Sequence, residues 1–322
     1  MQEKGSELTV ALNTNIVILG AGFIGLSFAA VFEDAGFRVT LADPDPQRRA
    51  EAAEGINAQR EAIELAGLGQ KKAGNVSVVP APDTALGAAG LVIECGPENL
   101  RIKQEIFADL LAKTGDNTVL ATASSAIRMS QIVPDIRDQT RCLVAHPMNP
   151  PAVLRIIELC PAPGTAATSV GAAAAIFAAA GFAAARLDQE IEGFILNRLQ
   201  GAVLREAYRL VDEGVAEPND IDTAVRLGLG PRWALAGPFE TAELNTPGGI
   251  PAHAERMGPA YKRMGEARGE TVDWNEPLIL RVADARATAR SGMTIPDRAR
   301  WRSRAVARLV ALRNDLLGNA DA

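Results

Sequence analysis

The chain has 322 residues, which favours about two domains at the usual ~150 residues each. Hydrophobic residues make up 48% and charged residues 22%, a balance that predicts a soluble globular protein. The formal net charge is −6, and the arginines between residues 298 and 313 alternate with apolar residues, as on an amphipathic surface helix. We therefore expect no nucleic-acid partner, because such a partner needs a dense basic surface.

The uncharged stretch 16–32 is nearly long enough to resemble a membrane span. Gly20, Gly22 and Gly25 interrupt it, and it ends at the acidic Glu33. A strand, a tight turn and a buried helix explain this stretch better, so we expect no membrane partner.

The chain contains three cysteines, Cys95, Cys142 and Cys160, all in apolar runs. Their number is odd and their spacing matches no metal-binding motif, which favours buried, reduced thiols and no metal site. The N-terminal residues lack the charged-then-apolar order of a signal peptide. We therefore expect a cytoplasmic protein.

Short β-branched runs alternate with helical segments over the first half of the chain. The predicted helices are 23–35, 46–66 and 100–113, and the predicted strands are 15–19, 38–42, 76–79, 91–94, 118–122 and 142–145. Strands and helices that alternate at this spacing predict an α/β fold with a doubly wound, mostly parallel sheet.

The pattern of predicted helices and strands changes in the second half of the chain. An Ala-rich helix at 166–180 and a last strand at 182–187 precede a region in which only amphipathic helices are predicted. We therefore expect a first domain over 1–190 and an all-helical second domain over 191–322.

A glycine-rich motif, Gly20-Ala21-Gly22-Phe23-Ile24-Gly25, follows the first predicted strand and opens the first predicted helix. This is the context in which G-x-G-x-x-G binds a dinucleotide, with the pyrophosphate at the helix N-terminus. Asp43 ends the next strand at close to the expected ~20 residues, where its carboxylate accepts hydrogen bonds from an adenosine ribose. The same carboxylate repels a 2′-phosphate, so NAD is favoured over NADP.

His146 comes directly after the run 142–145, at the edge of the sheet where ligands bind in open α/β folds. Oxidation of an alcohol by hydride transfer needs a base for the hydroxyl proton, and imidazole suits that role. Glu158 is a charged residue in an apolar run, and buried carboxylates are rarely unpaired. The two residues predict a base and its orienting carboxylate, although a lone histidine after a strand is also commonly structural.

Five longer segments make a family recognisable. They are HPMNPP at 146–151, IIEL at 156–159, GFILNRLQ at 193–200, EAYRLVDEG at 206–214 and GPFET at 237–241. With these motifs the chain resembles the L-3-hydroxyacyl-CoA dehydrogenase superfamily, and most closely its L-gulonate 3-dehydrogenase (lambda-crystallin) branch, from residue 15 to about 317.

The resemblance implies roles for individual residues. His146 matches the catalytic histidine and Glu158 its partner, while Ser125 and Asn197 match the residues that bind the substrate oxygen. The alternative roles are a helix cap for Ser125 and a helix–helix hydrogen bond for Asn197.

The segment around Glu98 and Lys103 resembles the family segment beside the nicotinamide ribose. Members that act on CoA thioesters carry a long, Lys-rich helical hairpin that residues 46–75 replace with a shorter segment. Arg232 stands where CoA-type members have small or aromatic residues, and an arginine there suits a substrate carboxylate.

These features predict NAD-dependent oxidation of the 3-hydroxyl of a small free L-3-hydroxy acid, similar to L-gulonate, to the 3-keto acid. The resemblance also implies a homodimer. An L-3-hydroxyacyl-CoA or L-carnitine substrate remains an alternative. An alternative of another class is a non-catalytic, NAD-binding structural protein of the crystallin kind.

Overall fold

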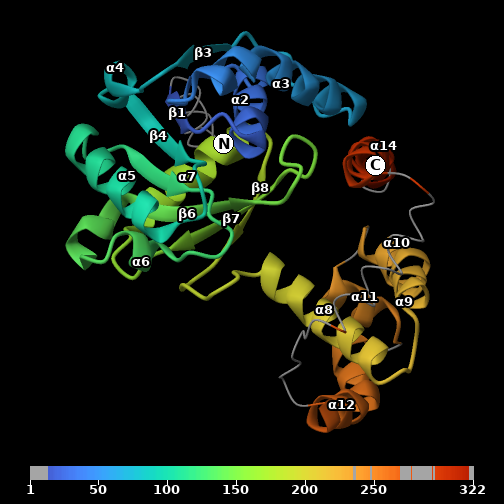
Figure 1. The fold of residues 1–322 in the computed structure, drawn as a ribbon. Helices are drawn as coiled ribbons and strands as arrows, with labels where there is room; N and C mark the ends of the chain where they lie inside the picture. The colour runs from blue at the N-terminus through green and yellow to red at the C-terminus, as the bar shows by residue number, and fades with distance from the viewer. Residues whose placement is uncertain are drawn as a thin grey trace. The chain divides into compact units, whose positions relative to one another are not determined.

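The computed structural model describes residues 14–234, 237–246, 249–268 and 294–318, together with Pro277 and Gly292. The chain divides into two compact units (Figure 1). One unit comprises Met1–Arg198 with Ser303–Ala311, and the other comprises Leu199–Arg302 with Leu312–Ala322.

The first unit contains an eight-stranded sheet in the order β3-β2-β1-β4-β5-β6-β7-β8. All neighbouring strands are parallel except β6 and β7, which are antiparallel. The strands are β1 (Asn15–Leu19), β2 (Arg38–Ala42), β3 (Asn75–Val79), β4 (Ala89–Glu94), β5 (Val119–Thr122), β6 (Cys142–Pro147), β7 (Ile156–Pro161) and β8 (Ala183–Arg186). The predicted fold class, a mostly parallel doubly wound sheet followed by helices, is confirmed.

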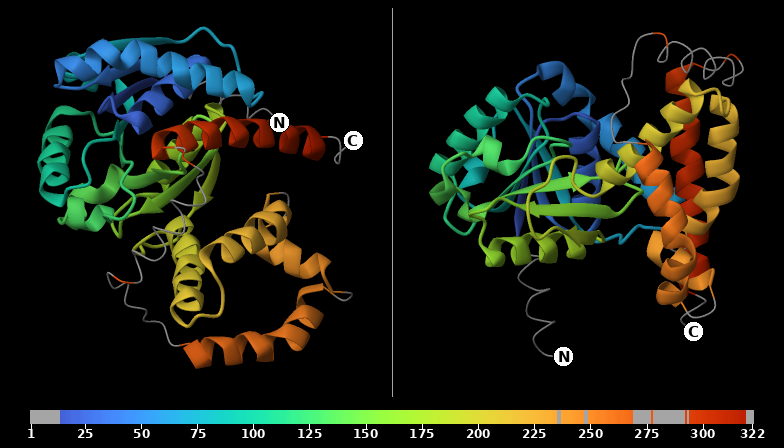
Figure 2. Two further views of the ribbon diagram at one scale, coloured as in Figure 1. Left: turned by 45° about the vertical axis from the view of Figure 1, so that its right-hand side comes forward. Right: turned by 90° about the horizontal axis from the view of Figure 1, so that it is seen from below.

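Helices cover both faces of this sheet, as Figures 1 and 2 show from three sides. They are α2 (Phe23–Asp34), α3 (Pro46–Leu65), α4 (Asp83–Leu86), α5 (Leu100–Lys113), α6 (Met129–Ile132) and α7 (Ala167–Ala179), with a 3₁₀ turn at Ile136–Arg141. Two apolar clusters fill the space between the sheet and the helices on its two faces. Ile16 and Ile18 pack with residues of α2, α3 and α7, whereas Val17 packs with residues of α4, α5 and α6. This alternation follows from the period-2 geometry of β1.

The helices begin where their sequences provide side-chain caps. Asp45 accepts a hydrogen bond from the Gln47 N–H at the start of α3, and Asn99 accepts one from the Ile102 N–H at the start of α5. The cap at Asn99 starts α5 at Leu100, shortly after β4 ends at Glu94.

The described part of the second unit is helical. Its elements are α8 (Leu196–Asp212, whose first turn belongs to the first unit), α9 (Pro218–Ala224), a π-helical turn (Val225–Leu229), α10 (Gly230–Trp233), α11 (Pro238–Leu244), α12 (Gly249–Arg268) and α14 (Ile295–Gly318). The middle of α14 belongs to the first unit, where Ala307 is buried with Ala66 and Val153. The first unit is therefore built from two separate segments of the sequence. Among the helices described, none is long and apolar enough to cross a membrane.

Candidate active site

The glycine-rich loop joins β1 to α2. At two of its positions the surrounding backbone leaves no room for a Cβ atom, so only glycine fits. Gly20 has φ +105, and a Cβ there would lie 2.8 Å from the Cys95 carbonyl oxygen. A Cβ on Gly25 would overlap the Gly20 carbonyl oxygen, so α2 packs this closely only with glycine. Gly22, the N-cap of α2, faces open space instead. The loop thus leaves room at a helix N-terminus, which is the arrangement that a pyrophosphate needs.

Asp43 follows β2 and lies against this loop. Its Oδ2 accepts a hydrogen bond from the Ala21 N–H at 2.8 Å, and its Oδ1 accepts one from the Asp45 N–H at 2.9 Å. Arg48 Nη1 lies 3.8 Å from Asp43 Oδ2, and Arg49 Nη1 donates to the Asp43 carbonyl oxygen at 2.9 Å. The predicted link between the glycine motif and Asp43 is therefore a direct contact, and Arg49 contributes to the same turn.

His146 and Glu158 are directly opposite one another on the antiparallel strands β6 and β7. The distance between His146 Nδ1 and Glu158 Oε2 is 2.6 Å, and Glu158 is fully buried. Glu158 Oε1 accepts hydrogen bonds from the N–H groups of Ile195 (2.7 Å) and Leu196 (2.9 Å) at the start of α8. One carboxylate therefore orients the imidazole and stabilises the first turn of a helix, where the helix dipole favours a negative charge. The bond at Nδ1 directs His146 Nε2 away from Glu158.

Ser125 lies in the turn after β5, and its carbonyl oxygen accepts a hydrogen bond from Asn197 Nδ2 at 2.7 Å. This contact joins the turn to the start of α8, whose N-terminus Glu158 also contacts. The hydroxyl that caps the turn belongs to Ser124, whose Oγ accepts a hydrogen bond from the Ile127 N–H at 2.8 Å.

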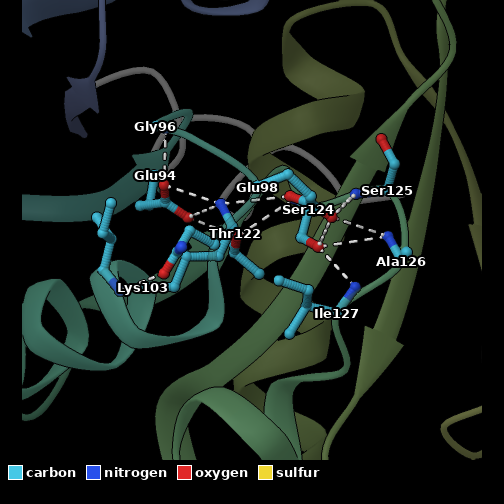
Figure 3. A network of polar contacts seen from close by, with 11 residues as sticks. Glu94, Gly96, Glu98, Lys103, Thr122, Ser124, Ser125, Ala126 and Ile127 are labelled. Atoms are coloured by element: carbon cyan, nitrogen blue, oxygen red, sulfur yellow. Dashed lines mark hydrogen bonds and ion pairs between the residues drawn. The ribbon is translucent and has the colours of Figure 1, made fainter.

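A second polar network lies at the ends of β4 and β5 (Figure 3). Glu94, the last residue of β4, is fully buried and pairs with Lys103 of α5 at 2.7 Å. Glu98 Oε1 accepts hydrogen bonds from Ser124 Oγ at 2.6 Å and from two backbone N–H groups of the following turn. Burial raises the pKa of the Glu98 carboxyl, but the Ser124 hydroxyl, the Lys103 ammonium and these two N–H groups outweigh it and hold the pKa below its ordinary value. Glu98 is therefore ionised at neutral pH.

The polar groups gather at one edge of the sheet because of its topology. β1, β2, β4, β5 and β6 run parallel, so their carboxyl ends meet at the same edge. The glycine loop, Asp43, Glu94, Thr122 and His146 all lie at or just beyond these ends. Glu94 and Thr122 are additions to the residues predicted from sequence. The sequence does mark Glu94, because it is a charged residue at the end of an apolar strand. Glu158 is marked in the same way, as a charged residue within an apolar run.

Arg232 belongs to the second unit, where it lies on α10 and its Nε donates to the Gly228 carbonyl oxygen at 3.3 Å. It is exposed and is not among the residues that the first unit brings together.

Two other classes of chemistry find no support in the described part of the chain. Its His, Cys, Asp and Glu side chains form no group of three that could hold a metal ion. Burial raises the pKa of all three thiols, to about 12 for Cys142 and to about 11 for Cys160, which disfavours the reactive thiolate form at neutral pH.

Two family models together match most of the chain. The model of the 3-hydroxyacyl-CoA dehydrogenase NAD-binding domain matches residues 15–191, and the model of the C-terminal domain of the same family matches residues 193–286. The first match coincides with the sheet and its glycine loop, and the prediction of NAD as cofactor is confirmed.

Individual relatives span nearly the whole chain. A lambda-crystallin homolog of Bos taurus is 35% identical over 94% of this chain and 96% of its own length. An L-carnitine dehydrogenase of Streptomyces griseus is 32% identical over 90% of this chain and 87% of its own length. Among solved structures, an NAD+-dependent 5-formyl-3-hydroxy-2-methylpyridine 4-carboxylic acid 5-dehydrogenase superposes with a TM-score of 0.82, at 25% identity over 95% of this chain and 99% of that one. The chain belongs to the 3-hydroxyacyl-CoA dehydrogenase family and is an oxidoreductase that acts on CH–OH groups with NAD.

Proposed function

We propose that this enzyme oxidises the 3-hydroxyl of a small free L-3-hydroxy acid, similar to L-gulonate, to the corresponding 3-keto acid. The observation that carries the proposal is the 2.6 Å contact between His146 Nδ1 and the fully buried Glu158. A carboxylate at Nδ1 fixes the ring tautomer and leaves Nε2 to exchange a proton with the substrate hydroxyl.

Each residue of the proposed site has one step to perform. His146 Nε2 takes the hydroxyl proton, and Glu158 offsets the positive charge that the ring then carries. When bound, NAD would supply the acceptor for the hydride that leaves C3. Ser125 and Asn197 bind the substrate oxygen. The hydrogen bond from Asn197 Nδ2 to the Ser125 carbonyl oxygen supports this, because it holds the two residues next to each other.

Cofactor binding is assigned to the loop Gly20–Gly25 and to Asp43, Glu98 and Lys103. The open space at Gly22 and the free N-terminus of α2 suit the pyrophosphate. By resemblance to the family, Glu98 would face the nicotinamide ribose; its Oε1 accepts the Ser124 hydroxyl, and its Oε2 lies 3.6 Å from Lys103 Nζ. Lys103 acts through Glu98, because its ammonium is buried among carboxylates.

Removing the charge of Asp43 should narrow the preference for NAD over NADP by about tenfold, because a 2′-phosphate would no longer meet an anion. Asp43→Asn should lower the preference for NAD while keeping an oxygen that accepts the Ala21 N–H. Asp43→Ala should lower the preference for NAD too, and it should also weaken the binding of both cofactors. The measurement is kcat/KM for NAD and NADP in the three proteins. Equal values for both cofactors in the unmutated enzyme would show that Asp43 does not select between them.

The free-acid substrate is supported by the segment 46–75, in which the single helix α3 replaces the Lys-rich hairpin of CoA-type members. Relatives named L-carnitine dehydrogenase favour carnitine as the second candidate, since carnitine is also a free 3-hydroxy acid. A panel of free 3-hydroxy acids, L-carnitine and 3-hydroxyacyl-CoA thioesters, followed by NADH absorbance, tests the proposal. We expect the highest kcat/KM with a free hydroxy acid, and a preference for thioesters would overturn that assignment.

Arg232 is proposed to bind the substrate carboxylate. Arg232→Met should raise KM for the hydroxy acid by roughly 10²-fold, because truncating one partner of a charge-assisted pair costs several kcal/mol. NAD affinity should not change, and Arg226→Met provides a matched arginine control on the preceding helical turn. An unchanged KM would make Arg232 a surface charge.

We further propose a cytoplasmic homodimer with a domain boundary near residue 190. The dimer is supported by large apolar side chains that the second unit exposes, among them Leu227 (67%), Phe239 (83%) and Leu244 (72%). Light scattering should give twice the 33.9 kDa chain mass. A monomer at micromolar concentration would contradict the dimer.

A further inference from the structure

One buried lysine faces two carboxylates at the edge of the sheet (Figure 3). Lys103 Nζ lies 2.7 and 3.0 Å from the two oxygens of Glu94 and 3.6 Å from Glu98 Oε2. Lys103 is 1% exposed and Glu94 is fully buried, whereas the Glu98 side chain is 43% exposed. Because a buried ammonium needs a nearby anion, its position depends on which carboxylate holds it.

Glu94 is the more firmly fixed of the two anions. Its Oε2 accepts a hydrogen bond from Thr122 Oγ1 at 2.6 Å, and its Oε1 accepts one from the Gly96 N–H at 2.7 Å. With the two bonds from Lys103, this carboxylate joins β4, β5, α5 and the loop after β4. Lys103 therefore stays with Glu94 rather than moving toward Glu98.

Glu98 holds the turn after β5 through its Oε1, while its Oε2 lies 3.6 Å from Lys103 Nζ. Its Oε1 accepts hydrogen bonds from Ser124 Oγ at 2.6 Å and from the N–H groups of Ser125 and Ala126 at 3.1 Å each. One carboxylate oxygen thus organises the turn that presents Ser125. A displacement of Glu98 would release this turn.

We propose that Glu94 is a positioning residue of the dehydrogenase site: it retains the Lys103 ammonium, so that Glu98 remains bound to the turn that carries Ser125. This inference rests on the proposed function, in which Ser125 binds the substrate oxygen. Because Glu94 is fully buried, we assign it no contact with the substrate or the cofactor.

The charge of Glu94 is the property that matters. Glu94→Gln keeps the size of the side chain but removes the anion that lies nearest to Lys103. Glu98, 3.6 Å away, then becomes the nearest anion, and opposite charges attract strongly where water is excluded. Glu98 moves toward Lys103 and leaves the N–H groups of Ser125 and Ala126. If Lys103 is also replaced by methionine, nothing draws Glu98 away and it returns to the turn.

The experiment compares Glu94→Gln, the double variant Glu94→Gln/Lys103→Met and a control, Lys113→Met. Lys113 is on the same helix but is exposed, with Asp83 and Asp109 as its partners. Steady-state kcat/KM for the hydroxy acid and an NAD titration are measured for each. Glu94→Gln should lower kcat/KM by roughly 10–10²-fold, since a misplacement of about 1 Å has effects of this size. At saturating NAD the double variant should regain part of that loss but stay below the parent, because Lys103 belongs to the assigned cofactor site. The control should match the parent.

A split between KM and kcat separates positioning from a general loss of structure. A smaller folded fraction lowers kcat and leaves KM unchanged, whereas a displaced Ser125 turn should raise KM for the hydroxy acid in Glu94→Gln. An unchanged KM in that variant contradicts the proposal.

Two further results would overturn the inference: parental kcat/KM in Glu94→Gln, or a double variant no better than the single one. If Glu94→Gln does not fold, the double variant is compared with Glu98→Gln, and equal impairment of the two overturns the inference. Ser125→Ala separates this inference from the proposed function. Impaired Ser125→Ala beside normal Glu94→Gln contradicts only the role of Glu94, whereas normal Ser125→Ala contradicts the substrate role of Ser125 and, with it, this inference.

Discussion

His146→Gln should lower kcat by roughly 10²–10⁴, the usual contribution of a positioned acid–base group. Glutamine keeps a polar side chain of similar reach that can still contact Glu158, but it cannot take the hydroxyl proton. Binding of NAD should not change, because the proposed anchors of the cofactor, Gly20–Gly25 and Asp43, lie beyond the ends of β1 and β2 rather than β6.

The measurement is steady-state kcat beside a cofactor titration. A matched control is His253→Gln, which replaces the other histidine of the chain, on α12, where its Nδ1 lies 3.2 Å from Thr246 Oγ1. If His146→Gln bound NAD normally and its kcat stayed within a few-fold of the parent, His146 would be a structural residue at the end of a strand.

Glu158→Gln should lower kcat by less than His146→Gln, roughly 10–10²-fold. The amide can still accept a hydrogen bond from the ring, but it no longer offsets the charge that the ring gains during the reaction. The same substitution weakens the cap of α8, since the N–H groups of Ile195 and Leu196 lose a charged acceptor.

A thermal melt of Glu158→Gln should therefore show a lower Tm, whereas His146→Gln leaves this cap intact. The two consequences separate the two roles of the carboxylate. A Glu158→Gln variant with unchanged kcat and a lowered Tm would make Glu158 only a helix cap. If kcat and Tm were both unchanged, neither the contact of Glu158 with His146 nor its contact with the start of α8 would matter.

Much of the first unit could be predicted from local sequence patterns. Parallel strands such as β1 and β4 are short apolar runs, because both of their faces are covered by helices. Glu158 could be singled out because a charge in such a run requires a partner. Its pairing opposite His146 could not be derived from the runs themselves, since it depends on the register of the antiparallel strands β6 and β7.

Other features depend on contacts between distant segments. The capping hydroxyl of the turn after β5 is Ser124 rather than Ser125, and nothing in the dipeptide distinguishes the two. The burial of Ala307 against Ala66 and Val153 joins residues far apart in sequence, so no local composition change marks it. Glu94 ends an apolar run and so reads only as the last residue of a strand, whereas its full burial at the centre of a polar network depends on contacts with β5 and α5.

In the proposed reaction a hydride leaves C3 of a free 3-hydroxy acid, and bound NAD would accept it. A substrate that carries deuterium at C3 tests this most directly, with mass spectrometry of the reduced cofactor after turnover. We expect the reduced cofactor to carry the deuterium and the acid product to be the 3-keto acid. Unlabelled NADH formed from this substrate would mean that the hydride comes from another carbon, and it would contradict the proposed reaction.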